Sequence, residues 1–385
     1  MSILVSSWSK EAQAVPANYV FPPEIRPGDL AAPVCKGIPV IDLGQIGGHA
    51  RAELLEKIIK ASQDFGMFQV INHGVSEGLM DDTMSLFKEF FDMPVEDKAA
   101  YYSEDKSKSF RLYTSGQNYL KDKVNYWKDS MKHSCHPLED HIQSWPEKPA
   151  RYREVVGTYS AEVRKLSLRI LDLICEGMGI EMGYFADELS KSQSLVINHY
   201  PPCPNPSLVL GVGGHCDPNL ITILLSMCMG FRSSRMTSNG KLKSAKHRAV
   251  TNSSIARTSI VTFISPSREC VIEPAKALVS VCSPPLFKAV QYKEFSDTYM
   301  AKTHDPNSTA VESYKFQAKV MLYSEFDCPT GVTSREDVVL FILGVNILLS
   351  DYDLEIEGFF RDKGNEDKAS TPRFAVALSA EPRKW

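Results

Sequence analysis

Apolar residues in the first half of the chain recur at the three- and four-residue spacing of amphipathic helices. This spacing predicts helices over 51–66, 77–93 and 151–176. Each stretch is ended or followed by a residue that stops helices, namely Gly66, Pro94 and the pair Gly177 and Gly179. The stripe over 151–176 is the longest, and we interpret it as a face that packs on the core.

Shorter apolar runs bounded by turn residues predict strands. Two of them, 38–43 and 67–71, lie in the first half of the chain. Four more follow Ser190, at 196–200, 220–225, 259–264 and 271–272. Helices followed by strands favour an α+β chain whose second half is a β-sandwich or barrel. Residues 1–37 contain five prolines and predict an extended lead-in.

Composition narrows the classes of function. The 385 residues are 43% hydrophobic and 23% charged, which is ordinary for a globular protein. With 47 acidic and 43 basic residues the formal charge is −4, so nothing favours nucleic acid as a partner. The nine cysteines include no CxxC pair, which favours a reducing compartment over a disulfide framework.

Signals for secretion and for membrane insertion are missing from the sequence pattern. The first residues lack the basic start and the apolar core of a secretory signal. The longest apolar run, Val338–Leu349, has twelve residues, whereas a membrane-spanning helix needs about twenty. We therefore expect no membrane partner and a cytoplasmic protein.

The segment Gly213-Gly-His-Cys-Asp-Pro218 holds the first candidate chemistry. His215 and Asp217 are two residues apart, so on an extended segment both side chains project to the same side. An imidazole and a carboxylate are two-thirds of the facial triad that holds ferrous iron. A His-x-Asp triplet also occurs by chance in many proteins, so it is a weak signal by itself.

A second group of candidate residues follows at 247–259. His247 supplies the further histidine that the triad needs. Arg257 and Ser259 are again two residues apart at the start of a predicted strand, where a guanidinium fork and a hydroxyl can grip a terminal carboxylate. An arginine that stood alone would more simply form a surface ion pair.

Together these segments resemble the 2-oxoglutarate- and iron(II)-dependent dioxygenases of plants. The resemblance extends over 16–316 and is carried by IPVIDL (38–43), DFGMFQVINHGV (64–75), NHYPPCPNP (198–206), LGVGGHCDPNLITIL (210–224) and SNGKLKSAKHRAVTN (238–252). Within the family, YWKDSMKHSCHP (126–137) is most similar to the hyoscyamine 6-dioxygenase-type enzymes.

The resemblance implies a fold and two groups of site residues. The fold would be an N-terminal helical region followed by a double-stranded β-helix, or jelly-roll, core. The metal ligands would be His215, Asp217 and His247. The residues that bind 2-oxoglutarate would be Arg257, Ser259, Tyr200 and Asn198.

The resemblance also implies the reaction. The expected cofactors are Fe²⁺, 2-oxoglutarate as cosubstrate and O₂, with ascorbate supporting activity. The expected substrate is a small plant specialised metabolite, with a tropane-type alkaloid as one candidate, which is hydroxylated or oxidised while succinate and CO₂ are released. We expect a monomer.

Two features depart from the family pattern. Asp217 and His247 are only thirty residues apart, so several core strands would be missing between 226 and 238. Residues 317–385 resemble nothing in the family, and are either an added module or, like the short interval, the mark of a faulty or alternatively spliced product. The predicted division is a lead-in (1–37), an N-terminal dioxygenase region (38–145), a core helix region (146–190), the Fe(II)/2-oxoglutarate β core (191–316) and a C-terminal extension (317–385).

Three hypotheses of function remain open from the sequence. An active dioxygenase is the first. A catalytically impaired or inactive member of the family that still binds ligands is the second, because core strands would be missing. A zinc hydrolase that uses the same three ligands is the third, and it would leave Arg257 and Ser259 without a purpose.

Overall fold

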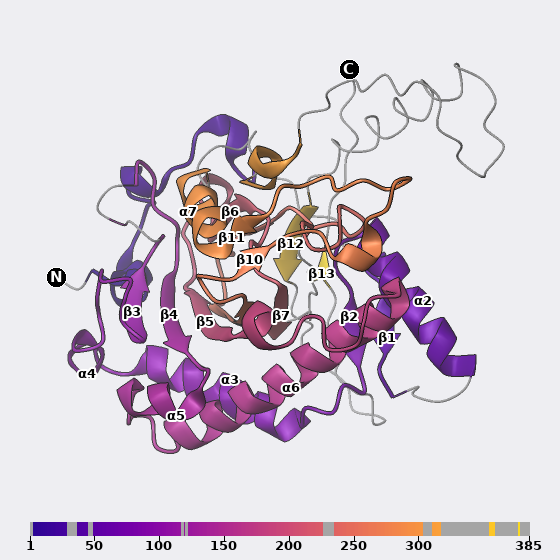
Figure 1. Ribbon diagram of the computed structural model, residues 1–385. Helices are drawn as coiled ribbons and strands as arrows, with labels where there is room; N and C mark the ends of the chain where they lie inside the picture. Colours follow the sequence, from indigo (N-terminus) through magenta and orange to yellow (C-terminus); the bar gives the residue numbers. More distant parts are fainter. Residues whose placement is uncertain are drawn as a thin grey trace, which may run out of the picture.

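Helices from the first half of the chain pack against strands from the second half in the computed structural model (Figure 1). The structure describes residues 3–28, 37–44, 49–116, 119, 122–225, 235–302, 310–316, 354–358 and 376–377. The α+β class expected from the sequence is confirmed. Among the described residues, none of the helices has the length and apolar character needed to cross a bilayer.

All three predicted helices are present. They are α2 (His49–Asp64), α3 (Glu77–Asp92) and α6 (Tyr152–Met178). Gly179 ends α6 with φ +67°, a left-handed conformation that glycine adopts without strain. The shorter helices are α1 (Val5–Trp8), α4 (Val95–Ala99), α5 (Leu138–His141) and α7 (Tyr292–Lys302).

A five-stranded antiparallel sheet forms the centre of the molecule. Its strand order is β3 (Phe110–Thr114), β4 (Asp129–Ser134), β5 (Ser192–Tyr200), β9 (Arg257–Ser265) and β7 (Ile221–Leu225). The three strands β5, β7 and β9 were predicted, whereas β3 and β4 were not. Because β3 and β4 come from the N-terminal half, the sheet is assembled from both halves of the chain.

A smaller sheet has the order β13 (Val376–Ala377), β12 (Leu354–Gly358), β8 (His247–Ala249) and β6 (Val212–His215). Strand β12 pairs with β8 in parallel, while the other neighbours are antiparallel. Strands β12 and β13 belong to the C-terminal extension, for which the sequence predicts no structure. The apolar run Val338–Leu349 lies outside the described residues.

Two minor sheets complete the strands. Strand β1 (Val40–Asp42) pairs in parallel with β2 (Gln69–Ile71), and both were predicted from the first-half apolar runs. Strand β10 (Val271–Ile272), also predicted, pairs in antiparallel fashion with β11 (Val290–Gln291).

One face of the five-stranded sheet is apolar and is covered by helices. Ile197 of β5 and Ile260 of β9 belong to the main hydrophobic cluster together with Phe87 of α3 and Ile170 of α6. Figure 1 shows α3 and α6 running beneath the strands on this side. This interface between helices and sheet is the core of the fold.

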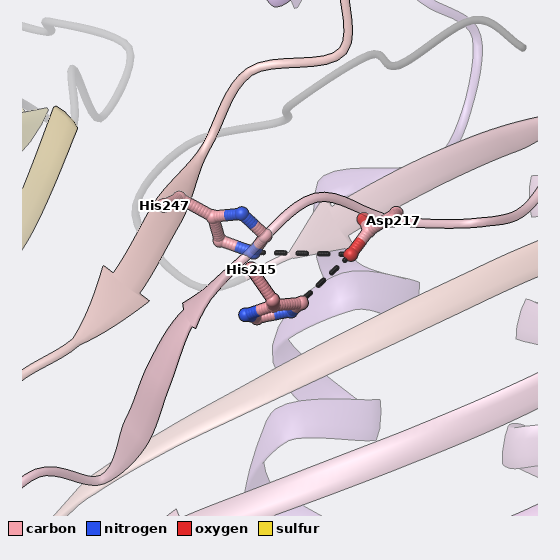
Figure 2. A group of neighbouring side chains, drawn as sticks. All are labelled: His215, Asp217 and His247. Carbon is pink, nitrogen blue, oxygen red and sulfur yellow. Dashed lines mark ion pairs between the residues drawn. The ribbon is translucent and has the colours of Figure 1, made fainter. Parts of the chain in front are cut away.

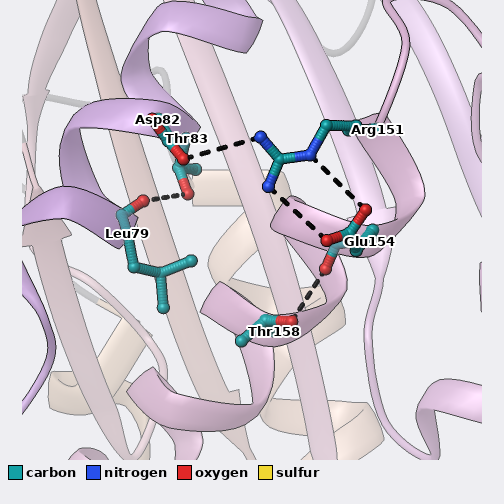
Figure 3. A network of polar contacts seen from close by, with 6 residues as sticks. All are labelled: Leu79, Asp82, Thr83, Arg151, Glu154 and Thr158. Carbon is teal, nitrogen blue, oxygen red and sulfur yellow. Dashed lines mark hydrogen bonds and ion pairs between the residues drawn. The ribbon is translucent and has the colours of Figure 1, made fainter.

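A polar network links α3 to the start of α6 (Figure 3). Arg151, which precedes α6, lies 4.0 Å from the carboxylate of Asp82 and 3.5 Å from that of Glu154. Thr83 and Thr158 each donate to a backbone carbonyl one turn earlier in their own helices. Because exposed ion pairs contribute little, the contact between α3 and α6 depends mainly on their apolar faces.

The other face of the five-stranded sheet lies against the smaller sheet. Arg257 of β9 donates to the backbone carbonyl of Val250, which follows β8, at 3.4 Å. A Cβ at Gly211, which precedes β6, would meet the ring of Tyr200 at 2.5 Å. A glycine at this position therefore allows the two sheets to approach closely. The space between the sheets holds the residues considered next.

Candidate active site

Two histidines lie opposite each other on neighbouring strands of the smaller sheet. His215 is the last residue of β6 and is the register partner of His247, the first residue of β8. The register shifts by one residue between Val212 and His215, which is a β-bulge that contains two glycines. This bulge sets the two imidazoles opposite each other, with ring centroids 4.0 Å apart.

The carboxylate of Asp217 faces both imidazoles from one side (Figure 2). Its Oδ1 is 3.3 Å from Nε2 of His215 and 3.9 Å from Nε2 of His247. Strand β6 ends at His215, and Asp217 lies two residues further on in the connection to β7, where residues 216–218 form no turn or bend. From this connection the carboxylate faces both rings.

The hydrogen bonds around this group prepare its atoms for a metal ion. The backbone carbonyl of Gly213 accepts from Nδ1 of His215 at 2.8 Å, which leaves Nε2 with a lone pair. Thr222 of β7 donates to Oδ2 of Asp217 at 2.8 Å, which leaves Oδ1 facing the histidines. Partners of this kind fix the orientation of metal ligands.

The donor set indicates which metal the group suits. One ligand atom from each of the three residues lies within 4.8 Å of the others, and no second group of this kind is found among the described residues. Small rotations of the side chains would close them on one ion. Two imidazoles and one carboxylate on one side of an ion form the 2-His-1-carboxylate triad of non-haem Fe(II) oxygenases. The residues therefore fit ferrous iron.

The four residues expected at the cosubstrate form one patch on the five-stranded sheet. Tyr200 is the register partner of Arg257, and Asn198 is the register partner of Ser259. Since i and i+2 residues of a strand share a face, all four side chains point toward the smaller sheet. The guanidinium carbon of Arg257 lies 4.1 Å above the ring of Tyr200, a cation–π contact that holds the fork in place.

Two residues that the sequence did not single out orient the amide of Asn198. Lys128 and Ser130 both donate to Oδ1 of Asn198 at 2.8 Å. An ammonium group can only donate, so the amide oxygen must face Lys128, and the amide nitrogen remains available as a donor. Burial lowers the pKa of Lys128 to about 7. No alternation marked these two residues, because 128–132 reads Lys-Asp-Ser-Met-Lys, with a single apolar residue.

Comparisons with known proteins agree with this geometry. The model of the N-terminal domain described as non-haem dioxygenase in morphine synthesis matches residues 38–151, and that of the 2OG-Fe(II) oxygenase superfamily matches residues 191–266. Hyoscyamine 6-dioxygenase of Hyoscyamus niger is 41% identical over 349 residues, which cover 82% of this chain and 99% of that protein. The 2'-deoxymugineic-acid 2'-dioxygenase of Hordeum vulgare is 37% identical, covering 74% and 90%.

A solved structure supports the same assignment. The crystal structure of JOX2 in complex with 2OG, Fe and JA superposes with a TM-score of 0.71 at 28% identity, covering 82% of this chain and 98% of that one. This chain therefore belongs to the family of plant 2-oxoglutarate- and Fe(II)-dependent dioxygenases. It is an enzyme of this class, which uses Fe²⁺, 2-oxoglutarate and O₂ and acts on small molecules.

Proposed function

We propose that this chain oxidises a small plant metabolite with His215, Asp217 and His247 as its iron ligands. The observation that carries the proposal is the meeting of the three ligand atoms beside the Arg257–Tyr200 pair. Arg257 and Ser259 would grip the distal carboxylate of 2-oxoglutarate, and Tyr200 and Asn198 would assist them. These seven residues are the proposed active site.

The protein's part in the reaction is to bind and to orient. Iron bound with 2-oxoglutarate and O₂ supplies an oxidant able to hydroxylate an unactivated carbon, with succinate and CO₂ as co-products. The Arg257 fork fixes the far end of the cosubstrate through paired hydrogen bonds. Nδ2 of Asn198, held by Lys128 and Ser130, donates to the near end. Thr222 keeps the carboxylate of Asp217 turned toward the metal.

The class of prime substrate is the finer part of the proposal. A tropane-type alkaloid is supported by the 41% identity to hyoscyamine 6-dioxygenase. The name of a second relative points to an acid, 2'-deoxymugineic acid. We expect a monomeric, cytoplasmic enzyme that binds neither nucleic acid nor membranes. Its β core would be a jelly roll, and its regions would meet after residues 37, 145, 190 and 316.

A catalytically impaired enzyme is the second candidate. Among the described residues, β7 is an edge strand that pairs only with β9, beside the metal ligands. Residues 226–234, where the chain is short against its family, lie outside the described residues. An open edge at this place supports the proposal that part of the barrel wall is missing, which would admit water to the iron.

One assay separates these alternatives. The purified protein is given Fe²⁺, ascorbate and 2-oxoglutarate without prime substrate, and succinate is measured. An active dioxygenase forms succinate slowly in this uncoupled reaction, whereas an impaired member forms none although it binds 2-oxoglutarate. Metal analysis of the protein as isolated tests the zinc hydrolase, because bound zinc together with no response to added Fe²⁺ would contradict both dioxygenase hypotheses.

A further inference from the structure

A tyrosine that is not among the proposed active-site residues lies against the β-bulge beside His215. A Cβ at Gly213 would meet the hydroxyl oxygen of Tyr126 at 2.6 Å and the ring carbons Cε1 and Cζ at 3.3 Å. Gly213 does not have a positive φ, so its backbone conformation alone does not require a glycine. A glycine is needed there because the phenol occupies the place of a side chain.

Other contacts hold the ring of Tyr126 in this place. The opposite ring edge faces Gly116, where a Cβ would meet Cδ2 at 3.4 Å and Cε2 at 3.5 Å. One ring face stacks on Phe21, with centroids 5.5 Å apart and an angle of 27° between the planes. The backbone N–H of Tyr126 donates to the hydroxyl of Ser115 at 2.7 Å. Because both edges and one face of the ring are occupied, the hydroxyl has little freedom to move away from Gly213.

The hydroxyl of Tyr126 is also hydrogen-bonded to the backbone of Gly213. Burial raises the pKa of Tyr126 and the charge of Asp122 raises it further, whereas this hydrogen bond acts in the opposite direction. A hydrogen bond that favours the phenolate must come from a donor. The N–H of Gly213 therefore donates to the phenol oxygen.

Gly213 links this tyrosine to a proposed iron ligand. Its carbonyl accepts from Nδ1 of His215 at 2.8 Å, which leaves Nε2 for the metal. The N–H of Gly213 thus meets Tyr126, while its C=O meets His215. A residue without a side chain rotates easily about both bonds of its α carbon, so a contact from outside is needed to hold the carbonyl in one direction. Groups that orient a histidine ligand in this way influence its metal affinity.

The N-terminal segment covers one face of Tyr126. Phe21 is 5% exposed and belongs to a small buried cluster on which Tyr126 packs. The carbonyl of Asn18 accepts from the N–H of Asn125, the residue before Tyr126, at 2.8 Å. Residues 18–21, which the sequence predicts only as part of an extended lead-in, therefore hold the tyrosine by backbone and by side chain.

We propose that Tyr126 is a positioning residue for the iron site, which orients His215 through the backbone of Gly213 and is itself held by Phe21 of the N-terminal segment. The inference rests on the proposed function, because it takes His215 to be an iron ligand. It gives the lead-in a part in metal binding, although no residue of the lead-in lies among the proposed ligands.

The first experiment removes the hydroxyl alone. In Tyr126→Phe the ring can still stack on Phe21, but Gly213 loses its acceptor, so we expect the dissociation constant for Fe²⁺ to rise about tenfold. This constant is measured without oxygen, by competition with a coloured chelator. At saturating Fe²⁺ the rate of uncoupled succinate formation should return to that of the unaltered protein, whereas a folding defect would lower the rate at every iron concentration.

The matched control is Tyr184→Phe, at another half-buried tyrosine, which follows the end of α6. It should leave the dissociation constant for Fe²⁺ unchanged. The thermal midpoint of the metal-free protein should be similar in the two variants, so that a difference in iron affinity between them does not reflect a general loss of stability.

A double-mutant cycle tests whether the contact with Gly213 carries the effect. Gly213→Ala places a methyl group against the hydroxyl of Tyr126 and should weaken Fe²⁺ binding at least about tenfold. In Tyr126→Phe the hydroxyl is gone, and the methyl group meets only ring carbons at 3.3 Å. The same alanine should then cost less, so the double variant should bind Fe²⁺ more tightly than the product of the two single losses predicts.

Phe21→Leu tests the part of the N-terminal segment. Leucine keeps an apolar side chain in the cluster but removes the ring that stacks on Tyr126. We expect the dissociation constant for Fe²⁺ to rise about threefold. An unchanged constant in this variant would overturn the role of Phe21.

The positioning role and the proposed function fail in different ways. Unchanged Fe²⁺ affinity in Tyr126→Phe, or independent effects in the cycle, would overturn the positioning role alone. Fe²⁺ binding as tight in His215→Ala as in the unaltered protein, or no binding in either, would contradict the proposed function and this inference together. Iron binding that depends on His215 and Tyr126 without any succinate formation would contradict the active enzyme and support the positioning role.

Discussion

The five-stranded sheet and the smaller sheet differ in how firmly their strands are held. Strands β5 and β9 pair through nine consecutive register partners, from Ser192 opposite Ser265 to Tyr200 opposite Arg257. Strands β6 and β8 share only two register pairs, with a bulge between them. The long sheet carries the residues proposed to bind 2-oxoglutarate, whereas the short one carries the two histidines.

Because of this difference, the two halves of the proposed active site should differ in local stability. The cosubstrate patch lies on strands whose opposite face is packed by helices, so its geometry is fixed by the core. The histidines lie where few backbone hydrogen bonds hold the chain, and such regions open locally at low cost. Metal binding then couples to the ordering of the smaller sheet. Four predictions test this contrast, from the largest expected effect to the smallest.

The largest effect is expected from loss of a metal ligand. Asp217→Asn keeps the shape of the side chain but removes the charge that holds it between two imidazoles. We expect iron affinity and succinate formation to fall by at least about 100-fold, with thermal stability nearly unchanged, since the core lies elsewhere. Cys216→Ser, which alters the residue between the two ligands, is the matched control. Iron retained at full stoichiometry in Asp217→Asn would show that Asp217 is not a ligand.

Removing the C-terminal strands should weaken the smaller sheet specifically. Strand β12 pairs with β8 in the register Leu354 opposite His247. Truncation after Phe316 removes this partner, so we expect the melting temperature to fall by about 5 °C and iron affinity by about tenfold. Affinity for 2-oxoglutarate should change less, because β5 and β9 are untouched.

A point substitution gives a milder form of the same experiment. Ile356→Pro removes one backbone N–H donor of β12 and disfavours a strand. Ile356→Thr keeps the N–H donor and is compatible with a strand. We expect only the proline variant to reproduce the weaker iron binding. If the truncated protein is as stable, as soluble and as well loaded with iron as the intact chain, β12 does not support β8.

The same contrast explains what the sequence could predict. Strands β5, β7 and β9 were recognised because their buried faces give short apolar runs. Strands β3 and β4 were missed because polar residues stand on the face that packs on the core, Thr114 in β3 and Asp129 and His133 in β4, which breaks the alternation of apolar and polar residues. The three proposed metal ligands were chosen by residue type, but the bulge at Gly213 was not predicted, because strand register depends on distant partners.

The pairing of β12 with β8 lies further beyond reach of the sequence. Leu354 and His247 are far apart along the chain, and no local pattern encodes a parallel pair between them. The orientation of Asp217 is a similar case, because it depends on a hydrogen bond from Thr222, which lies in another sheet. Local rules thus describe the larger sheet better than the smaller one.

A buried histidine of the larger sheet should make the free energy of unfolding fall at acid pH. The pKa of His199 on β5 is lowered from its usual 6.5 to about 4 by burial and, next, by the charge of Lys98. Between these values the unfolded chain binds a proton that the folded chain does not, so the free energy of unfolding falls as the pH falls from 6.5 to 4. From pH 7 to pH 5 the loss amounts to about 2 kcal/mol.

The variant His199→Phe should remove this part of the loss. A phenylalanine preserves the stacking on Phe91, at 4.5 Å between centroids, while it gives up the contact of Nδ1 with Thr258. Urea unfolding at pH 7 and pH 5 measures the change. His133, whose pKa burial lowers to about 3, remains and keeps some sensitivity. An identical fall in the variant would mean that His199 is protonated in the folded chain.

The smallest effect is expected at the anchor of the cosubstrate. Arg257→Lys keeps the charge but loses the planar fork and its stacking at 4.1 Å on Tyr200. We expect affinity for 2-oxoglutarate to fall about tenfold, which is ~1.4 kcal/mol, with iron binding unaffected because β9 belongs to the firmer sheet. Arg268→Lys, an exposed position beyond the end of β9, is the control. Unchanged affinity in Arg257→Lys would mean that 2-oxoglutarate is held by other residues.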